Sequence, residues 1–278
     1  MTPRDLIRNT SELFRIARIP DPEYDASVLL SYIYGKPSLS LRLDNDTILD
    51  EKTVLDYNAL AGRRIRREPL QYILREAPFF GHDFYVDRHV LIPRPETELL
   101  CEWASEVLSC EKQPQVLDLC CGSGCLGISL KLRKPSAAVT CSDISADALD
   151  VAKLNAFRLN ADVSFLQSDL FADVPDGLFN LIVSNPPYIP SSQCGTLQQE
   201  VMMEPRLALD GGSDGLYFYR IICREAIHRL LSGGSLMMEL GDGLSSEVLL
   251  MMEKAGFSSI EIRNDYQQIP RMIRGIFM

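Results

Sequence analysis

The 278-residue sequence predicts an α/β fold, in which a doubly wound parallel sheet with a late antiparallel ending follows a small helical domain. From Gln115 onward, short β-branched apolar runs alternate with amphipathic segments, as expected when helices cover both faces of a parallel sheet. Residues 1 to about 80 instead show helical spacing and no convincing strand alternation. A glycine-rich turn, Gly122–Gly127, directly follows the first apolar run, which is typical of a nucleotide-binding sheet.

The composition is that of an ordinary globular protein, with 24% charged and 46% hydrophobic residues. A formal net charge of −10 argues against a broad nucleic-acid surface, because phosphate contacts need clustered Lys and Arg. We find no apolar stretch long enough to span a bilayer, and residues 1–9 lack the apolar core of a secretory signal. A cytoplasmic protein without membrane contact is expected.

The eight cysteines are predicted to be reduced thiols, several of them within core strands or helices. Cys120, Cys121 and Cys125 lack the paired spacing of a zinc site, and no histidine lies near them in the sequence. The sequence therefore predicts no metal.

The first domain, residues 1–77, is expected to consist of helices. The apolar positions that recur at helical spacing in its first segment are Leu6, Leu13, Ile16 and Ala17. Pro20-Asp21-Pro22 ends this segment and begins the next helix, Glu23–Gly35. A third and longer helix is predicted from Asp50 to about Arg67.

A basic cluster made of Arg63, Arg64, Arg66 and Arg67 lies near the end of that third helix. A solvated helix face is the simpler interpretation of such a charge run. The alternative is a docking patch for an acidic or RNA-associated partner.

Residues 78–95 are expected to link this domain to the α/β domain at 96–278. The aromatic, β-branched segment around Phe79–Phe84 favours a hairpin, and His82 and His89 are interpreted as hairpin residues without an ionisable partner. Ile92-Pro93-Arg94-Pro95 must be extended, and a helix is expected from Glu96 or Thr97 to about Ser109.

The α/β domain is predicted to hold seven strands. The expected strands are Val116–Leu119, Ala138–Cys141, Val163–Gln167, Phe179–Ser184, Ser235–Glu239, Ser258–Ile262 and Arg271–Phe277. The expected helices are Cys125–Lys134, Ala146–Leu159, Leu216–Leu231 and Ser245–Lys254.

The turn Cys120–Gly124 and the segment after it match the dinucleotide fingerprint in Gly122-Ser-Gly124-Cys-Leu-Gly127. Asp143 ends the second strand, 19 residues past Gly124, where its carboxylate can accept both ribose hydroxyls. This pattern implies an adenosine-containing ligand and leaves open whether it is a nicotinamide cofactor or S-adenosylmethionine. A purely structural strand-to-helix turn is the alternative.

Asp169 and Leu170 follow the third strand and are expected beside the adenine. The Asp169 carboxylate would accept from the exocyclic amine and Leu170 would form an apolar wall. Asp169 could equally cap the next turn.

The fourth strand, Phe179–Ser184, stops at Asn185-Pro186-Pro187-Tyr188, where two prolines remove backbone donors and keep the chain extended. The Asn185 carboxamide oxygen and the Pro186 carbonyl could each accept one N–H of a planar –NH₂ group and aim its lone pair at a methyl sulfonium. Tyr188 could stack on the same group. Such a corner suits methylation of an amide or amine nitrogen by orientation and electrostatics, whereas hydride transfer has no use for it.

Several segments resemble the HemK/PrmC family of methyltransferases, which modify the glutamine of the Gly-Gly-Gln motif in peptide chain release factors. They are Pro69-Leu70-Gln71-Tyr72-Ile73, Leu91-Ile92-Pro93-Arg94-Pro95-Glu96-Thr97-Glu98, Asn185-Pro186-Pro187-Tyr188 and Glu204–Leu216. The resemblance covers nearly the whole chain. It implies a Rossmann-like class I S-adenosylmethionine-dependent methyltransferase sheet and a release-factor docking role for the N-terminal domain.

The resemblance also implies residue roles and products. S-adenosylmethionine would be converted to S-adenosylhomocysteine, and the residues implied to contact it are Cys120, Cys121, Gly122, Ser123, Gly124, Asp143, Asp169, Leu170 and Asn185. The residues implied to hold the glutamine amide are Asn185, Pro186, Pro187 and Tyr188. Of these, the catalytic residues would be Asn185, Pro186 and Tyr188. The family's turn has Gly and Thr where this chain has Cys120 and Cys121. The first position can thereby no longer adopt glycine-only dihedrals, although both cysteines are small enough for close approach to the cofactor. Leu170 offers adenine an apolar contact without the aromatic stacking of some relatives.

Three functions therefore stay open on the sequence. The favoured one is N5 methylation of glutamine in class 1 release factors, by a monomer that makes no direct contact with nucleic acid. The second is an adenine-N6 nucleic-acid methyltransferase, since Asn-Pro-Pro-Tyr is shared with such enzymes; the −10 charge opposes it. The third is a non-catalytic cofactor-binding interaction protein that has kept the fold.

Overall fold

The computed structural model describes residues 1–175 and 179–278. Two compact units emerge, one formed by Met1–Glu76 with Gln198–Met203 and the other by Ala77–Leu197 with Glu204–Met278. The short segment 198–203, which lies in the second half of the sequence, thus groups with the N-terminal helices. Each unit is described by itself.

The first unit is helical. Its helices are α1 (Pro3–Ile16), α2 (Pro22–Tyr34), α3 (Ser38–Leu43), α4 (Glu51–Ile65) and α5 (Leu70–Leu74). The Thr2 and Asp50 side chains accept the Asp5 and Thr53 N–H groups and so cap α1 and α4. Gly35 ends α2 at φ +69°, a left-handed conformation that favours glycine.

The core of this unit contains Phe14, Leu29, Leu30 and Tyr57, which have no exposed surface. Each such side chain contributes about 1.5–3 kcal/mol of burial free energy. Two of the apolar positions predicted for α1 are wrong as core residues: Leu13 is 51% exposed and Ile16 79%. The buried face of α1 contains Phe14 instead, because the contacts of α1 with α2 and α3 set the rotation of the helix about its axis.

The basic cluster is mostly internal to this unit, which contradicts both a solvated face and a docking patch for three of its four arginines. Arg63 pairs with Glu68, and Arg67 donates to Glu200 and to backbone carbonyls. The Arg64 side chain is only 5% exposed and donates to Asp25 and Glu200. Arg66 alone of the four is exposed. Arg63, Arg64 and Arg67 thus bind carboxylates and backbone carbonyls inside the unit.

The second unit is built on a seven-stranded sheet with the order β5-β4-β3-β6-β7-β9-β8. Its strands are β3 (Gln115–Leu119), β4 (Ala138–Asp143), β5 (Ser164–Gln167), β6 (Phe179–Ser184), β7 (Leu230–Glu239), β8 (Ser258–Asn264) and β9 (Pro270–Ile276). The strands from β5 to β7 run parallel, and β9 lies antiparallel to β7 and β8. The predicted α/β class and the antiparallel ending are confirmed.

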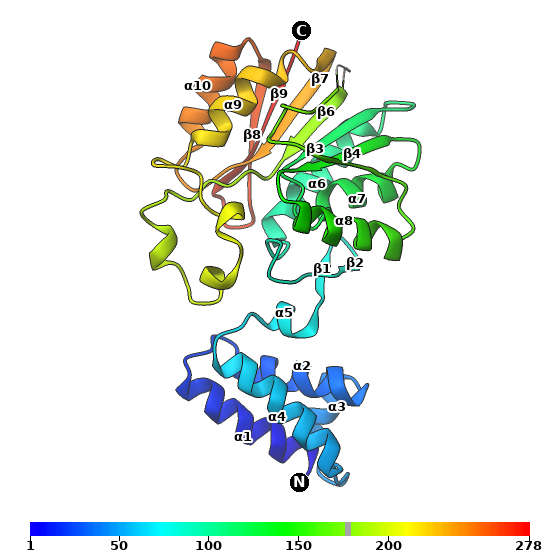
Figure 1. Ribbon diagram of the computed structural model, residues 1–278, viewed down its shortest axis with the longest axis vertical. Helices are drawn as coiled ribbons and strands as arrows, with labels where there is room; N and C mark the ends of the chain where they lie inside the picture. The colour runs from blue at the N-terminus through cyan, green and yellow to red at the C-terminus, as the bar shows by residue number, and fades with distance from the viewer. Residues whose placement is uncertain (176–178) are drawn as a thin grey trace. The chain divides into compact units, whose positions relative to one another are not determined.

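Helices cover both faces of this sheet (Figure 1). They are α6 (Pro95–Leu108), α7 (Cys125–Arg133), α8 (Ala146–Arg158), α9 (Tyr217–Ala226) and α10 (Ser245–Ala255). Trp103 and Leu126 belong to the core under α6, α7 and α8, whereas Tyr219 and Val248 belong to the opposite core under α9 and α10. Within the described residues, no helix is both long and apolar enough to cross a membrane.

The predicted hairpin is present as β1 (Ala77–Phe79) and β2 (His82–Phe84), paired antiparallel. Gly81 lies in its turn at φ +82°. His89 lies beyond this hairpin, and the expectation that it has no ionisable partner is wrong: its Nδ1 is 3.0 Å from Asp87 Oδ1.

Candidate active site

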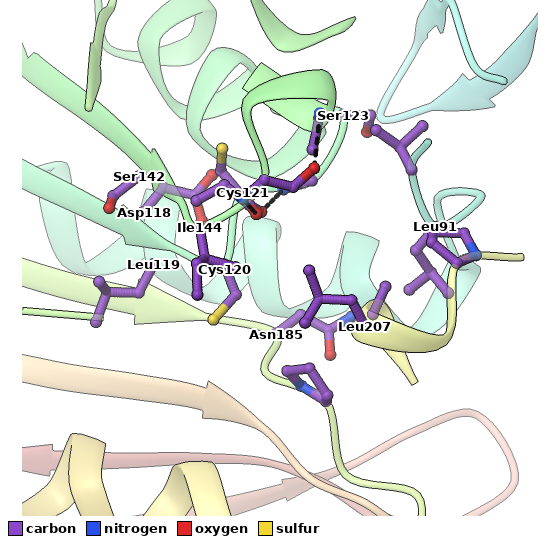
Figure 2. A pocket seen from close by; sticks show the side chains of 18 of the residues that line it. Leu91, Asp118, Leu119, Cys120, Cys121, Ser123, Ser142, Ile144, Asn185 and Leu207 are labelled. Atoms are coloured by element: carbon purple, nitrogen blue, oxygen red, sulfur yellow. Dashed lines mark hydrogen bonds between the residues drawn. The ribbon is translucent and has the colours of Figure 1, made fainter. Parts of the chain in front are cut away.

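A cavity of about 310 Å³ opens in the second unit at the carboxyl ends of β3, β4, β5 and β6. This edge of an open parallel sheet is where ligands bind. Of the predicted site residues, the structure brings Cys120, Cys121, Gly122, Ser123, Asp143, Asp169, Leu170, Asn185 and Pro187 into its wall. Gly124, Pro186 and Tyr188 lie outside the lining. Figure 2 shows Cys120 and Cys121 on one side and Leu91 on the other, with Asn185 and Leu207 between them.

The first turn of α7 is bound by a buried carboxylate to which no sequence pattern pointed. Asp118 Oδ2 accepts the Gly127 N–H at 2.8 Å, and burial raises the Asp118 pKa to about 7 against the effect of that bond. A Cβ at Gly127 would lie 2.6 Å from Cys141 Sγ, so α7 can approach β4 only because this position is glycine. A Cβ at Gly122 would meet nothing within 4 Å and would project into free space.

Cys120 adopts φ +58° although it carries a Cβ. This left-handed region is open to residues with a Cβ at a cost of about 1–2 kcal/mol, so the turn forms without glycine-only dihedrals at this position. Burial raises the pKa of the Cys120 and Cys125 thiols, and a hydrogen bond with Cys141 together with burial raises that of Cys121, so these cysteines stay neutral small side chains.

Asp143 stands at the end of β4, and its carboxylate also shapes the turn. Oδ2 accepts the Gly122 N–H and Oδ1 the Ser145 N–H, both at 2.9 Å, while burial raises its pKa. Each carboxylate oxygen has a second lone pair that remains for a ligand hydroxyl.

Asp169 is exposed at the cavity, whereas Leu170 is buried at φ +51°. The turn here is capped by Ser168, whose hydroxyl donates to the Leu170 carbonyl and accepts the Asp173 N–H. The side-chain cap of this turn is therefore Ser168, and not Asp169 as in the alternative interpretation.

The corner after β6 is tied to two residues that are distant in the sequence. Asn185 Nδ2 donates to Thr97 Oγ1 at 3.1 Å, and the Thr97 hydroxyl donates to Glu239 Oε2 at 2.6 Å. The Tyr188 hydroxyl donates to Glu239 Oε1 at 3.3 Å. Burial raises the Glu239 pKa to about 7, against the bonds from Thr97 and Tyr188 and the charge of Arg271.

The segment around Gly211 braces this corner from outside. The Ile189 N–H donates to the Leu209 carbonyl, and the Gly211 N–H donates to the Ile189 carbonyl at 2.8 Å. A Cβ at Gly211 would lie 2.6 Å from Tyr188 Cα and 2.8 Å from the Pro187 carbonyl oxygen. Backbone atoms cannot move aside locally, so this close approach requires glycine.

We expect Gly211→Ala to lower kcat of the predicted methyl transfer about 100-fold, because relief of the clash displaces the Asn185–Tyr188 backbone. Gly195→Ala is the matched control, since a Cβ there meets nothing within 4 Å and its φ is not positive. Steady-state kinetics of both variants measure the effect. Equal activity of the two variants would contradict the bracing role.

One rim of the cavity is held by a buried carboxylate, Glu204. Its Oε2 accepts the Ile92 N–H at 3.0 Å and its Oε1 accepts from Arg94 at 2.5 Å. Burial raises the Glu204 pKa, against the opposing charge of Arg94. This pairing brings the segment before α6 and the 3₁₀ turn Arg206–Ala208, which supplies Leu207, to the cavity.

The wall chemistry fits an adenosine-containing ligand. Gly122 leaves open space at the turn, and the carboxylates of Asp143 and Asp169 are hydrogen-bond acceptors. The side chains of Ile144 and Leu170 provide an apolar contact. No group of His, Cys, Asp and Glu side chains in residues 1–175 and 179–278 is arranged to hold a metal ion.

Comparisons with known proteins agree with this geometry. The model of the methyltransferase small domain matches residues 97–213, and that of the PrmC N-terminal domain matches residues 5–74. The release factor glutamine methyltransferase of Chlorobaculum tepidum is 40% identical over 96% of this chain and 94% of its own, and that of Geobacter sulfurreducens 42% identical over 89% and 87%.

Among solved structures, the T. thermophilus 16S rRNA N2 G1207 methyltransferase, in complex with AdoMet and guanosine, has a TM-score of 0.53 and 20% identity over 73% of this chain and 50% of its own. At that identity the likeness shows the fold alone, a Rossmann-like α/β sheet. The curated relatives show more, because they are 40–42% identical over nearly the full length of the chain: the chain belongs to the release factor glutamine methyltransferase family.

Proposed function

We propose that this protein methylates the side-chain amide nitrogen, N5, of the glutamine in the Gly-Gly-Gln motif of class 1 peptide chain release factors, with S-adenosylmethionine as methyl donor. The observation that carries the proposal is the Asn185 carboxamide at the wall of an adenosine-type cavity, with its NH₂ group already engaged by Thr97. Family membership supplies the substrate class.

The cofactor end of the cavity is assigned to the residues predicted from the sequence. Cys120 to Ser123 would surround the methionine portion, Asp143 the ribose, and Asp169 with Leu170 the adenine. When bound, S-adenosylmethionine supplies an electrophilic methyl group.

The substrate end relies on orientation. The glutamine nitrogen is a poor nucleophile because its lone pair is delocalised into the carbonyl. The Asn185 oxygen and the Pro186 carbonyl would each accept one N–H, which fixes the nitrogen in place and stabilises the positive charge that develops on it. Tyr188 is held by Glu239 next to this corner, and direct stacking of its ring on the substrate stays a prediction.

The test is transfer of tritium from S-adenosylmethionine to a purified release factor. We expect one methyl group on the motif glutamine, located by mass spectrometry, and none when that glutamine is replaced by Ala. Label in RNA or DNA but not in the release factor would favour the adenine methyltransferase. Cofactor binding without any transfer would favour the non-catalytic interaction protein.

Asp143→Ala is expected to weaken cofactor binding about 10–100-fold, because two hydrogen bonds to a charged acceptor are lost. Isothermal titration with S-adenosylhomocysteine measures the dissociation constant. Asp147→Ala, an exposed carboxylate on the next helix, is the control and should bind normally. Thermal unfolding without cofactor distinguishes lost ligand contacts from a collapsed turn.

The helical unit is assigned to docking of the release factor, in a cytoplasmic monomer that needs no direct contact with nucleic acid. Exposed apolar side chains on this unit support a protein-binding surface. They are Leu39, Leu43, Ile48 and Leu55, each 67–71% exposed. The assignment predicts that the α/β unit alone loses affinity for the release factor and keeps affinity for the cofactor.

A further inference from the structure

Two side chains beyond the predicted site form a chain of hydrogen bonds that ends on Asn185. Thr97, in the first turn of α6, is 3% exposed, and Glu239, the last residue of β7, is 1% exposed. Thr97 accepts from Asn185 and donates to Glu239. A buried carboxylate such as Glu239 costs several kcal/mol of desolvation unless it is compensated.

The direction of these bonds decides which end of the Asn185 carboxamide faces the cavity. The Thr97 hydroxyl, 2.6 Å from Glu239 Oε2, has one proton, and above pH about 7 Glu239 is ionised and accepts only, so that proton points at Glu239. The remaining lone pairs of Thr97 Oγ1 can then only accept, which selects the NH₂ end of Asn185. Among the described residues the Asn185 oxygen accepts no hydrogen bond and stays available.

Without this chain, both orientations of the carboxamide would be populated. The flipped orientation would present N–H groups to a substrate that also offers N–H groups, and these repel. Tyr188 reinforces the arrangement because its hydroxyl donates to the other oxygen of Glu239.

We propose that Thr97 and Glu239 are positioning residues that lock the Asn185 carboxamide with its oxygen toward the reacting amide. This inference rests on the proposed function for its kinetic consequence, whereas the orientation itself can be measured without any substrate. Thr97 acts through Asn185, and Glu239 acts through Thr97.

The experiment compares Thr97→Val, which has nearly the same shape and no hydroxyl, with Thr97→Ser, which keeps the hydroxyl. Protein labelled with ¹⁵N on asparagine gives one side-chain NH₂ resonance pair for Asn185, identified by its loss in Asn185→Ala. We expect this pair to shift in Thr97→Val and to stay in place in Thr97→Ser. An unchanged pair in Thr97→Val overturns the proposal, whether or not the release factor is the substrate.

Kinetics provide the second readout. We expect Thr97→Val to lower kcat about 10–100-fold, with the dissociation constant of S-adenosylhomocysteine unchanged, and Thr97→Ser to retain activity within about threefold. In the Asn185→Ala background, Thr97→Val should cause no further loss. Independent, multiplying losses would overturn action through Asn185. Thr97→Ala serves the same tests if valine is not accommodated. A wild-type protein that fails to methylate release factors refutes the proposed function alone.

Discussion

Asn185→Ala is expected to lower kcat for glutamine methylation about 10³-fold, the largest effect of any single substitution at this site. In the proposed mechanism the lost oxygen accepts from the nitrogen whose positive charge grows in the transition state, and removal of one such preorganised group costs about 3–4 kcal/mol. Single-turnover transfer from S-adenosylmethionine to a release factor measures the loss.

Two controls restrict that result to chemistry. Cofactor affinity should change by no more than severalfold, because most of the cavity wall is left intact. Asn264→Ala, at an exposed position of β8, should be fully active. Activity of Asn185→Ala within tenfold of the wild type would show that the substrate amide is held by other groups.

Much of the candidate site could be predicted because it depends on strand ends. Apolar runs of four to six residues identify β3, β4 and β6, and parallel strands bring their carboxyl ends to one edge. Cys120, Asp143 and Asn185, far apart in the sequence, therefore lie on one cavity. Gly122 and Gly127 pointed to the ligand site for two physical reasons. A Cβ at Gly127 is excluded sterically, and a Cβ at Gly122 would meet no atom within 4 Å, at a position that lines the cavity.

The parts that could not be predicted depend on pairing between distant polar residues. Thr97 and Glu239 are 142 positions apart, and neither carries a local pattern that points to the other. Asp118 was hidden within an apolar run, although a carboxylate there must find a buried donor, which is the Gly127 N–H. The arginine cluster at residues 63–67 likewise gives no indication in the sequence of which carboxylates it pairs with. Arg64 and Arg66 look alike in the sequence, yet one is buried and the other exposed.

That difference leads to the second large expected effect. Arg64→Ala should lower the free energy of unfolding of the helical unit by about 3–5 kcal/mol, because it leaves the buried Asp25 carboxylate without its arginine, while Glu200 keeps only its pair with Arg67. Arg66→Ala, the exposed neighbour, should change it by no more than about 0.5 kcal/mol. Urea unfolding, with hydrogen exchange of α2 and α4 peptides to localise the loss, measures both.

The loss should also depend on pH. Burial raises the pKa of Asp25 and Arg64 lowers it, so removal of Arg64 leaves the burial effect unopposed. The folded unit then holds a proton that the unfolded chain has released, and its stability falls as pH rises above the unfolded value of about 4. The deficit of Arg64→Ala relative to wild type should therefore be larger at pH 8 than at pH 5. A deficit that is equal at both, or no greater than that of Arg66→Ala, would contradict a buried Arg64–Asp25 pair as the main tie between α4 and α2.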